Sequence, residues 1–122
     1  QKLITVAVID SGIYPHIDFK NRIVAFKDFV NGRKNAYDDC GHGTHVSGII
    51  AGSGYASHGR IRGICPSACL AGIKVLDRLG NGRIENVLDA AGSEMCIRDR
   101  YKSCQYILRC NHIWRKGKSH CS

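Results

Sequence analysis

The stretch VAVIDSGI, residues Val6–Ile13, joins an apolar run to an acid, a serine and a glycine. The run, LITVAVI at Leu3–Ile9, is uncharged and rich in β-branched residues, which predicts a buried strand of a parallel sheet. Asp10 follows directly, and Gly12 would let the backbone turn sharply past it. Functional side chains collect at the carboxyl ends of such strands. Asp10 is therefore a candidate cleft-facing carboxylate; the alternative is an aspartate that only caps a turn.

Strand and helix patterns alternate along the chain as far as Ala91. RIVAFKDFV (Arg22–Val30) and CLAGIKVLD (Cys69–Asp77) predict two further strands. HVSGIIAG (His45–Gly52) predicts a short buried helix, and RIENVLDAA (Arg83–Ala91) begins an amphipathic one. This alternation indicates an α/β fold with a parallel sheet. Three strands with so little helix cannot cover both faces, so we expect the opening part of a larger domain.

Composition changes abruptly near the end of the predicted second helix. Residues 1–91 hold 11 Lys and Arg against 8 Asp and Glu, a net of +3, whereas residues 92–122 hold 7 against 2, a net of +5. Four of the seven cysteines lie in the second part, and the odd total argues against a complete disulfide framework. No apolar run approaches the length of a membrane span. The change predicts that two unlike sequences have been joined.

EMCIRDR, residues Glu94–Arg100, marks the junction. The codons GAG ATG TGT ATA AGA GAC AGG, a transposase end sequence used in DNA sequencing libraries, encode these residues in this order. Because such scars are excluded from fold reasoning, we predict two segments. Residues 1–91 are the N-terminal part of a larger α/β domain, and residues 92–122 are an unrelated, basic and cysteine-rich tail of artificial origin.

A second functional stretch is DDCGHGTHVSGIIAGSG, Asp38–Gly54, in which two histidines stand three positions apart among glycines. His42 lies at the entry to the predicted helix, where the glycines leave its ring uncrowded. An imidazole can take a proton from a hydroxyl and return it to a leaving group. A carboxylate on its other nitrogen would fix the tautomer. We therefore predict that Asp10 and His42, from different elements, meet in hydrogen-bonding contact.

A metal site is the alternative interpretation of this stretch. His42 and His45 at i, i+3 could ligate zinc, and two acids and Cys40 stand close by. Zinc motifs on helices usually bring a glutamate or a third spaced ligand, and none occurs at such a spacing here. The pattern therefore does not favour a metal site. We expect His45 to point inward as a buried, hydrogen-bonded histidine.

Three ordered blocks resemble the subtilisin-like serine proteases, the subtilases: VAVIDSGI, DDCGHGTHVSGIIAG and GICPSACLAGIKVLD. Shorter segments are most similar to the AprX-type bacterial alkaline proteases. The resemblance implies a partial subtilisin-like three-layer α/β fold with a parallel central sheet, incomplete at its C-terminal side. It further implies a serine endopeptidase in which Asp10 is the acid and His42 the general base of an Asp–His–Ser triad.

The family's nucleophile lies in a later Gly-Thr-Ser-type motif, which this chain lacks. The chain's serines all stand outside such a motif: Ser11, Ser47, Ser53, Ser57, Ser67, Ser93, Ser103, Ser119 and Ser122. The resemblance therefore predicts a fragment that carries the acid and the base without the serine. Because loss of triad members costs on the order of 10⁴-fold or more in rate, we expect this chain alone to be inactive.

The resemblance also implies a polypeptide substrate, no required cofactor, and neither a nucleic-acid nor a membrane partner. Asp18 matches a position that can ligate calcium in some subtilases, which makes calcium an option in the intact enzyme. The loop that would supply further ligands, GSGYASHGR at Gly52–Arg60, is short and different. Because the AprX-type group is partly intracellular, the expected compartment is cytoplasmic in preference to secreted.

A competing function rests on the tail YKSCQYILRCNHIWRKGKSHCS, residues 101–122. It would be a small, basic, non-catalytic module that binds single-stranded nucleic acid through basic and aromatic side chains, or zinc. The candidate zinc ligands are Cys104, Cys110, His112, His120 and Cys121. Their spacing lacks the paired C-x-x-C knuckles of strong zinc motifs, so the protease interpretation is favoured.

Overall fold

A computed structural model describes residues 4–86, 89–90 and 104–109, the last of these as backbone alone. Four strands, one α-helix and one short 3₁₀-helix make up the named elements of these residues. They are β1 (Thr5–Asp10), β2 (Ile23–Asp28), α1 (His42–Ala51), η1 (Tyr55–Ser57), β3 (Cys69–Lys74) and β4 (Cys104–Arg109). The three strands predicted before Ala91 are confirmed, each with ends shifted by a few residues.

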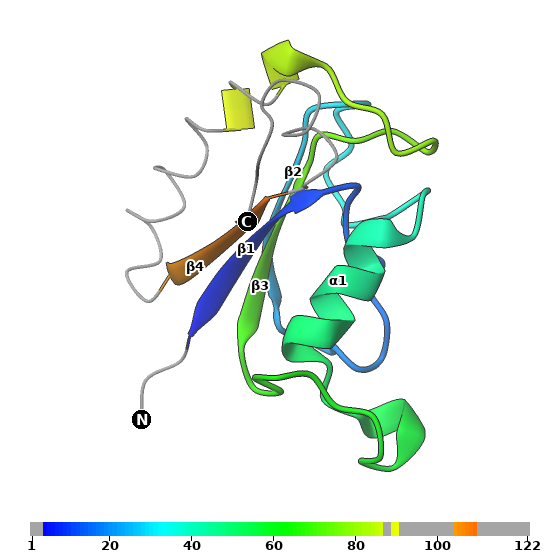
Figure 1. Cartoon of the computed structure of the whole chain (residues 1–122), viewed down its shortest axis with the longest axis vertical. Coiled ribbons are helices and arrows are strands. Elements are labelled where there is room, and N and C mark those ends of the chain that lie inside the picture. The colour runs from blue at the N-terminus through cyan, green and yellow to red at the C-terminus, as the bar shows by residue number, and fades with distance from the viewer. Residues whose placement is uncertain (1–3, 87–88, 91–103, 110–122) are drawn as a thin grey trace, which may run out of the picture.

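The strands form one parallel sheet in the order β2-β3-β1-β4 (Figure 1). The register pairs Asp10 of β1 with Lys74 of β3, and Lys74 with Asp28 of β2. Because the strands run in the same direction, these three polar residues end neighbouring strands at one edge of the sheet. The predicted α/β architecture with a parallel sheet is confirmed.

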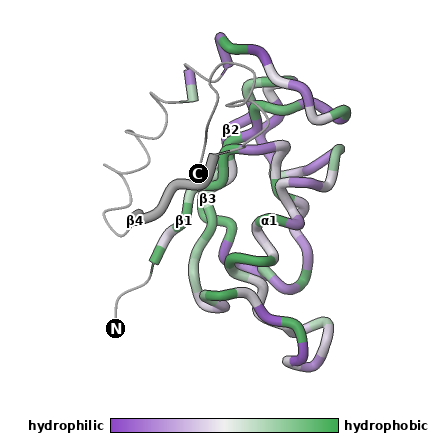
Figure 2. The backbone as a smooth tube through the Cα atoms, in the orientation of Figure 1, coloured by the Kyte–Doolittle hydropathy of each residue, from purple (hydrophilic) through white to green (hydrophobic). Residues whose placement is uncertain are grey.

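The central strands are buried on both faces, as the apolar runs predict. Alternate residues point to opposite sides of the sheet. Val6, Val8 and Leu70 join a core cluster that includes Ala51 of α1. Ile9 and Ile73 belong to a second cluster, which includes Ala90. Figure 2 shows the hydrophobic colour along β3 and the hydrophilic colour concentrated in the loops. Strands β1 and β3 thus carry buried apolar side chains on both faces of the sheet.

Helix α1 packs on β1 and β3 through a stripe of small residues (Figure 1). Gly43, Ser47 and Ala51 are its buried positions. At Gly43 an added Cβ would stand 2.1 Å from the main-chain oxygen of Gly12, so only glycine permits this approach. The helix begins at His42, three residues before the predicted start.

The prediction of an inward-pointing His45 is wrong, because its side chain is exposed. The buried side of α1 is the stripe Gly43, Ser47 and Ala51, whereas His45 and Ile49 face solvent, Ile49 with 52% exposure. Small side chains allow close contact between the helix and the sheet, and this contact fixes which face turns inward.

Strand β4 lies beside β1 and pairs with it in parallel. It falls in the segment that the sequence analysis excluded, and no strand was predicted there. The proposed boundary between residues 91 and 92 stays a prediction. Among the described residues, no helix is long and apolar enough to cross a membrane.

Candidate active site

Asp10 ends β1 with its carboxylate almost fully buried, at 4% side-chain exposure. The backbone N–H of Ser11 donates a 2.6 Å hydrogen bond to Asp10 Oδ1. Gly12 then turns the chain at φ 118°, and an added Cβ would stand 2.1 Å from the main-chain oxygen of Tyr37. The sharp turn predicted at Gly12 is therefore present, and it leaves Asp10 facing the start of α1.

His42 is the first residue of α1 and brings its ring to that carboxylate. Its Nδ1 lies 2.9 Å from Asp10 Oδ1 and 2.9 Å from Asp10 Oδ2. A carboxylate in its ionised form only accepts hydrogen bonds, so the partner that suits it is a protonated Nδ1. The predicted contact between Asp10 and His42 is present, across 32 positions of sequence.

The two side chains differ sharply in exposure. The side chain of His42 is 56% exposed, while that of Asp10 is 4% exposed. Within the described part of the chain, no hydrogen bond involves the other ring nitrogen, Nε2. A neutral imidazole with its proton on Nδ1 has a free lone pair on Nε2. Such an arrangement can remove a proton from an incoming hydroxyl, while the buried carboxylate stabilises the imidazolium that forms.

Asp38 and Ser11 hold the helix terminus that carries His42. Asp38 Oδ2 accepts the N–H and the hydroxyl of Thr44, and Asp38 Oδ1 accepts the N–H of Gly41 at 2.8 Å. Ser11 Oγ donates to Asp38 Oδ1 at 2.8 Å and accepts the N–H of Gly43 at 2.9 Å. Groups from outside the helix thereby satisfy N–H groups of its first turn.

Asp38 is half-buried, and its surroundings lower the pKa of its carboxyl group. Burial alone would raise the pKa of Asp38, but hydrogen bonds from Thr44, Gly41 and Ser11 outweigh it and hold the pKa below its ordinary value. This role of Asp38 was not predicted, although an acid a few residues before a helix is a recognisable capping signal.

His45 and the thiol of Cys40 make no hydrogen bond to the Asp10–His42 pair. His45 is exposed one turn further along α1, and Cys40 is an exposed free thiol. Among the described residues, no group of three or more His, Cys, Asp or Glu side chains is placed to hold a metal ion. Cys110, His112, His120 and Cys121 of the proposed zinc cluster lie outside the described residues, and of Cys104 only the backbone is described.

Asp18, the possible calcium ligand, is engaged in protein contacts. Its Oδ1 accepts the N–H of Ala56 at 2.8 Å, and its main-chain oxygen accepts the N–H of Ser53 at 3.1 Å. Calcium takes six to eight oxygen ligands, and this carboxylate alone does not fit such a site. Calcium elsewhere in the intact enzyme stays a prediction.

No described serine hydroxyl is hydrogen-bonded to His42. Ser11 is the described serine nearest in sequence to Asp10, and its hydroxyl is taken up by Asp38 and Gly43. Ser47 Oγ is buried and has no hydrogen-bond partner among the described residues. Among the described residues, then, no serine hydroxyl is placed against the Asp10–His42 pair.

Residues 1–102 match the family model described as the subtilase family. The chain belongs to the subtilase family. It is 49% identical over 96 residues to the serine protease AprX of Bacillus subtilis, which covers 79% of this chain and 21% of that relative. A crystal structure of a cold adapted subtilisin-like serine proteinase superposes with a TM-score of 0.63 at 34% identity, covering 73% of this chain and 30% of that chain. The subtilisin-like fold is therefore confirmed, in partial form.

Two further Bacillus subtilis relatives have names that indicate different cellular compartments. The chain is 44% identical to the minor extracellular protease Epr, over 71% of this chain and 13% of that protein. It is 42% identical to the major intracellular serine protease, over 72% of this chain and 29% of that protein. The cytoplasmic preference is not supported by these names. The chain spans less than a third of each of these subtilase relatives.

Proposed function

We propose that Asp10 and His42 are the acid and the general base of a serine-type endopeptidase whose nucleophile lies outside these 122 residues. The observation that carries this proposal is the contact of His42 Nδ1 with both oxygens of a buried carboxylate, each at 2.9 Å. Membership of the subtilase family supports the reaction class.

In this reaction the serine hydroxyl gives its proton to His42 Nε2 and attacks the peptide carbonyl carbon. Asp10 holds the ring in orientation and stabilises its positive charge. His42 then gives the proton to the leaving amine, which departs as the acyl-enzyme forms. Water hydrolyses the acyl-enzyme through the same base. The proposed substrates are flexible polypeptide segments, bound in extended form along strand edges.

The 122-residue chain holds two of the three groups that this reaction needs. Without an activated hydroxyl, His42 has no proton to accept from a nucleophile, and no acyl-enzyme forms. We therefore propose that the chain itself does not hydrolyse peptides. Activity would require the protein encoded by the uninterrupted reading frame, called here the full-length gene product.

Labelling with a serine-directed fluorophosphonate probe tests this proposal. The probe is expected to label the full-length gene product and to leave the 122-residue chain unlabelled at the same concentration. His42→Ala in the full-length product should abolish labelling, because the probe reacts with an activated serine. Labelling of the 122-residue chain, or undiminished labelling after His42→Ala, would overturn the assignment of roles.

A further inference from the structure

Lys74, the last residue of β3, carries a fully buried ammonium group with 0% side-chain exposure. Its Nζ donates three hydrogen bonds of 2.7 Å, to the main-chain oxygens of Ser11 and Leu76 and to Asp39 Oδ1. An ammonium has three donors, and all three are used. Burial of a charge is costly unless it is paired and hydrogen-bonded, so this site is built to hold a cation.

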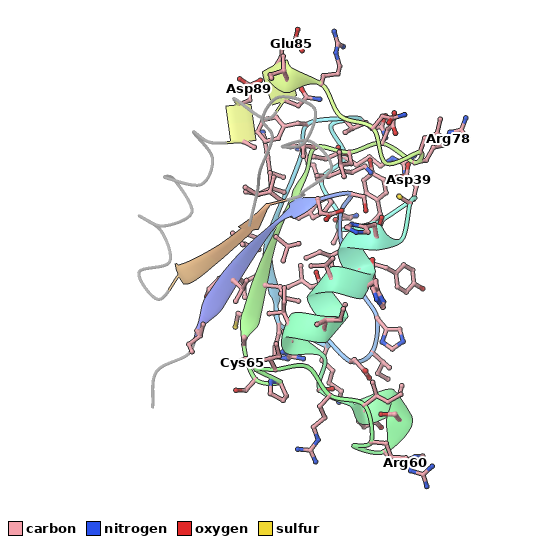
Figure 3. The ribbon with its side chains drawn as sticks, viewed as in Figure 1. Asp39, Arg60, Cys65, Arg78, Glu85 and Asp89 are labelled. Carbon is pink, nitrogen blue, oxygen red and sulfur yellow. The ribbon has the colours of Figure 1, made fainter. Side chains whose placement is uncertain are left out.

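Two of the three acceptors of Lys74, Ser11 and Asp39, belong to the segments that carry the proposed acid and base. Ser11 directly follows Asp10, with which Lys74 is paired across the strands. Asp39 precedes His42 by three residues and lies in the loop at the start of α1, where Figure 3 labels it. One ammonium group therefore connects the end of β1 to the loop that leads into the helix.

The aromatic ring of Tyr37 adds a further contact on the same loop. Lys74 Nζ lies 5.1 Å from the centroid of this ring, a distance at which a cation is attracted to the ring face. The main-chain oxygen of Tyr37 accepts the N–H of Ile13 at 3.1 Å. The segment before His42 is thus held to the segment after Asp10 both by its backbone and by the cation of Lys74.

We propose that Lys74 is a positioning residue that acts through Asp39 to keep His42 against Asp10. This inference rests on the proposed roles of Asp10 and His42. Lys74 itself touches neither ring nitrogen, and its contribution is to fix two backbone segments relative to each other. Asp39 is 37% exposed, so its carboxylate can turn to water when the lysine is removed. The loop then loses one of its fixed points.

The His42 Nδ1–H proton reports this positioning directly. We expect this proton to exchange more slowly with water while it is bonded to the buried Asp10 than when the ring leaves the carboxylate. We would measure its exchange rate by NMR on the ¹⁵N-labelled 122-residue chain as the wild type, Lys74→Met, Asp39→Ala and the double variant. Lys27→Met, at an exposed lysine of β2, is the matched control.

Lys74→Met and Asp39→Ala are each expected to speed the exchange about tenfold, and the double variant no more than either alone, since coupled contacts are not additive. Lys27→Met should leave the rate unchanged. If Lys74→Met prevents folding, the Asp39→Ala variant alone tests the proposal. Asp39 is partly exposed, so its replacement is expected to leave the chain folded. The proposal would be overturned by a wild-type exchange rate in Asp39→Ala. It would also be overturned if the double variant speeds exchange by the product of the two single effects. This experiment measures proton exchange and not peptide hydrolysis. A failure of this proposal can therefore be distinguished from a failure of the proposed peptidase function.

Discussion

The Nδ1 atom of His42 lies 2.9 Å from each carboxylate oxygen of Asp10, although 32 positions separate the two residues. The acid comes from the end of a buried strand and the imidazole from the first residue of a helix. This contact unites the two functional stretches of the sequence. Hydrogen bonds of Ser11 to Asp38 and to Gly43 fix the start of the helix next to this contact.

Replacing the acid by its amide tests whether the carboxylate orients the ring. Asp10→Asn presents an N–H group toward His42 Nδ1 and favours the wrong tautomer. We expect kcat of the full-length gene product on a peptide substrate to fall by about 10⁴-fold, the cost of such a change in other triads. Asp89→Asn, at an exposed acid (Figure 3), should leave kcat unchanged. A loss below tenfold in Asp10→Asn would count against the orienting role.

The sequence could predict the Asp10 and His42 contact because both residues stand at positions with a local signature. Asp10 follows an apolar, β-branched run, which identifies the end of a buried strand. His42 stands among glycines at a helix entry. Each signature can be recognised within ten residues, and the ordered resemblance to a family connects the two.

Lys74 and the buried face of α1 could not be predicted in the same way. Lys74 interrupts an apolar strand in the sequence, and its acceptors at Ser11 and Asp39 come from distant segments. The inward orientation expected of His45 was wrong because the helix contacts the sheet through small residues. Close packing on the sheet buries Gly43 and Ser47 instead. Both features depend on contacts that form only when segments distant in sequence come together in the fold.

Acid should destabilise the chain through two hydrogen-bonded aspartates, Asp38 and Asp28. The pKa of Asp38 is lowered from its ordinary value of 3.8. The pKa of Asp28 is lowered as well: burial would raise it, but hydrogen bonds from Tyr37, Asn31, Val30 and Arg33 outweigh burial. For a lowered folded-state pKa, the stabilisation is fully present above the unfolded value and is lost as pH falls through the folded value, since the unfolded chain binds more protons.

We therefore expect the urea midpoint of the 122-residue chain to fall as the pH is lowered below about 4. Asp38→Asn should lower the midpoint near neutral pH and reduce its dependence on acid, because one of the titrating carboxylates is gone. A midpoint that rises on acidification, or an equal acid response in Asp38→Asn, would contradict the capping account.

Two glycines of α1 offer a matched test of the close approach between helix and strand end. An added Cβ at Gly43 would stand 2.1 Å from the main-chain oxygen of Gly12, whereas at Gly48 nothing lies within 4 Å. Gly43→Ala should destabilise the 122-residue chain by about 3 kcal/mol through overpacking. Gly48→Ala should stabilise it by about 0.5–1 kcal/mol, because alanine favours a helix interior. Urea unfolding measures both, and equal stability of the two variants would contradict the packing.

The most direct test of the central claim compares two histidines in the full-length gene product. His42→Asn removes the proposed base, while His58→Asn makes the same change at an exposed position with φ 56°, which asparagine tolerates. The measurement is kcat/KM for hydrolysis of a peptide substrate. We predict a fall on the order of 10⁴-fold or more for His42→Asn and a wild-type value for His58→Asn. Retention of more than a tenth of wild-type kcat/KM by His42→Asn would contradict the assignment of His42 as the general base.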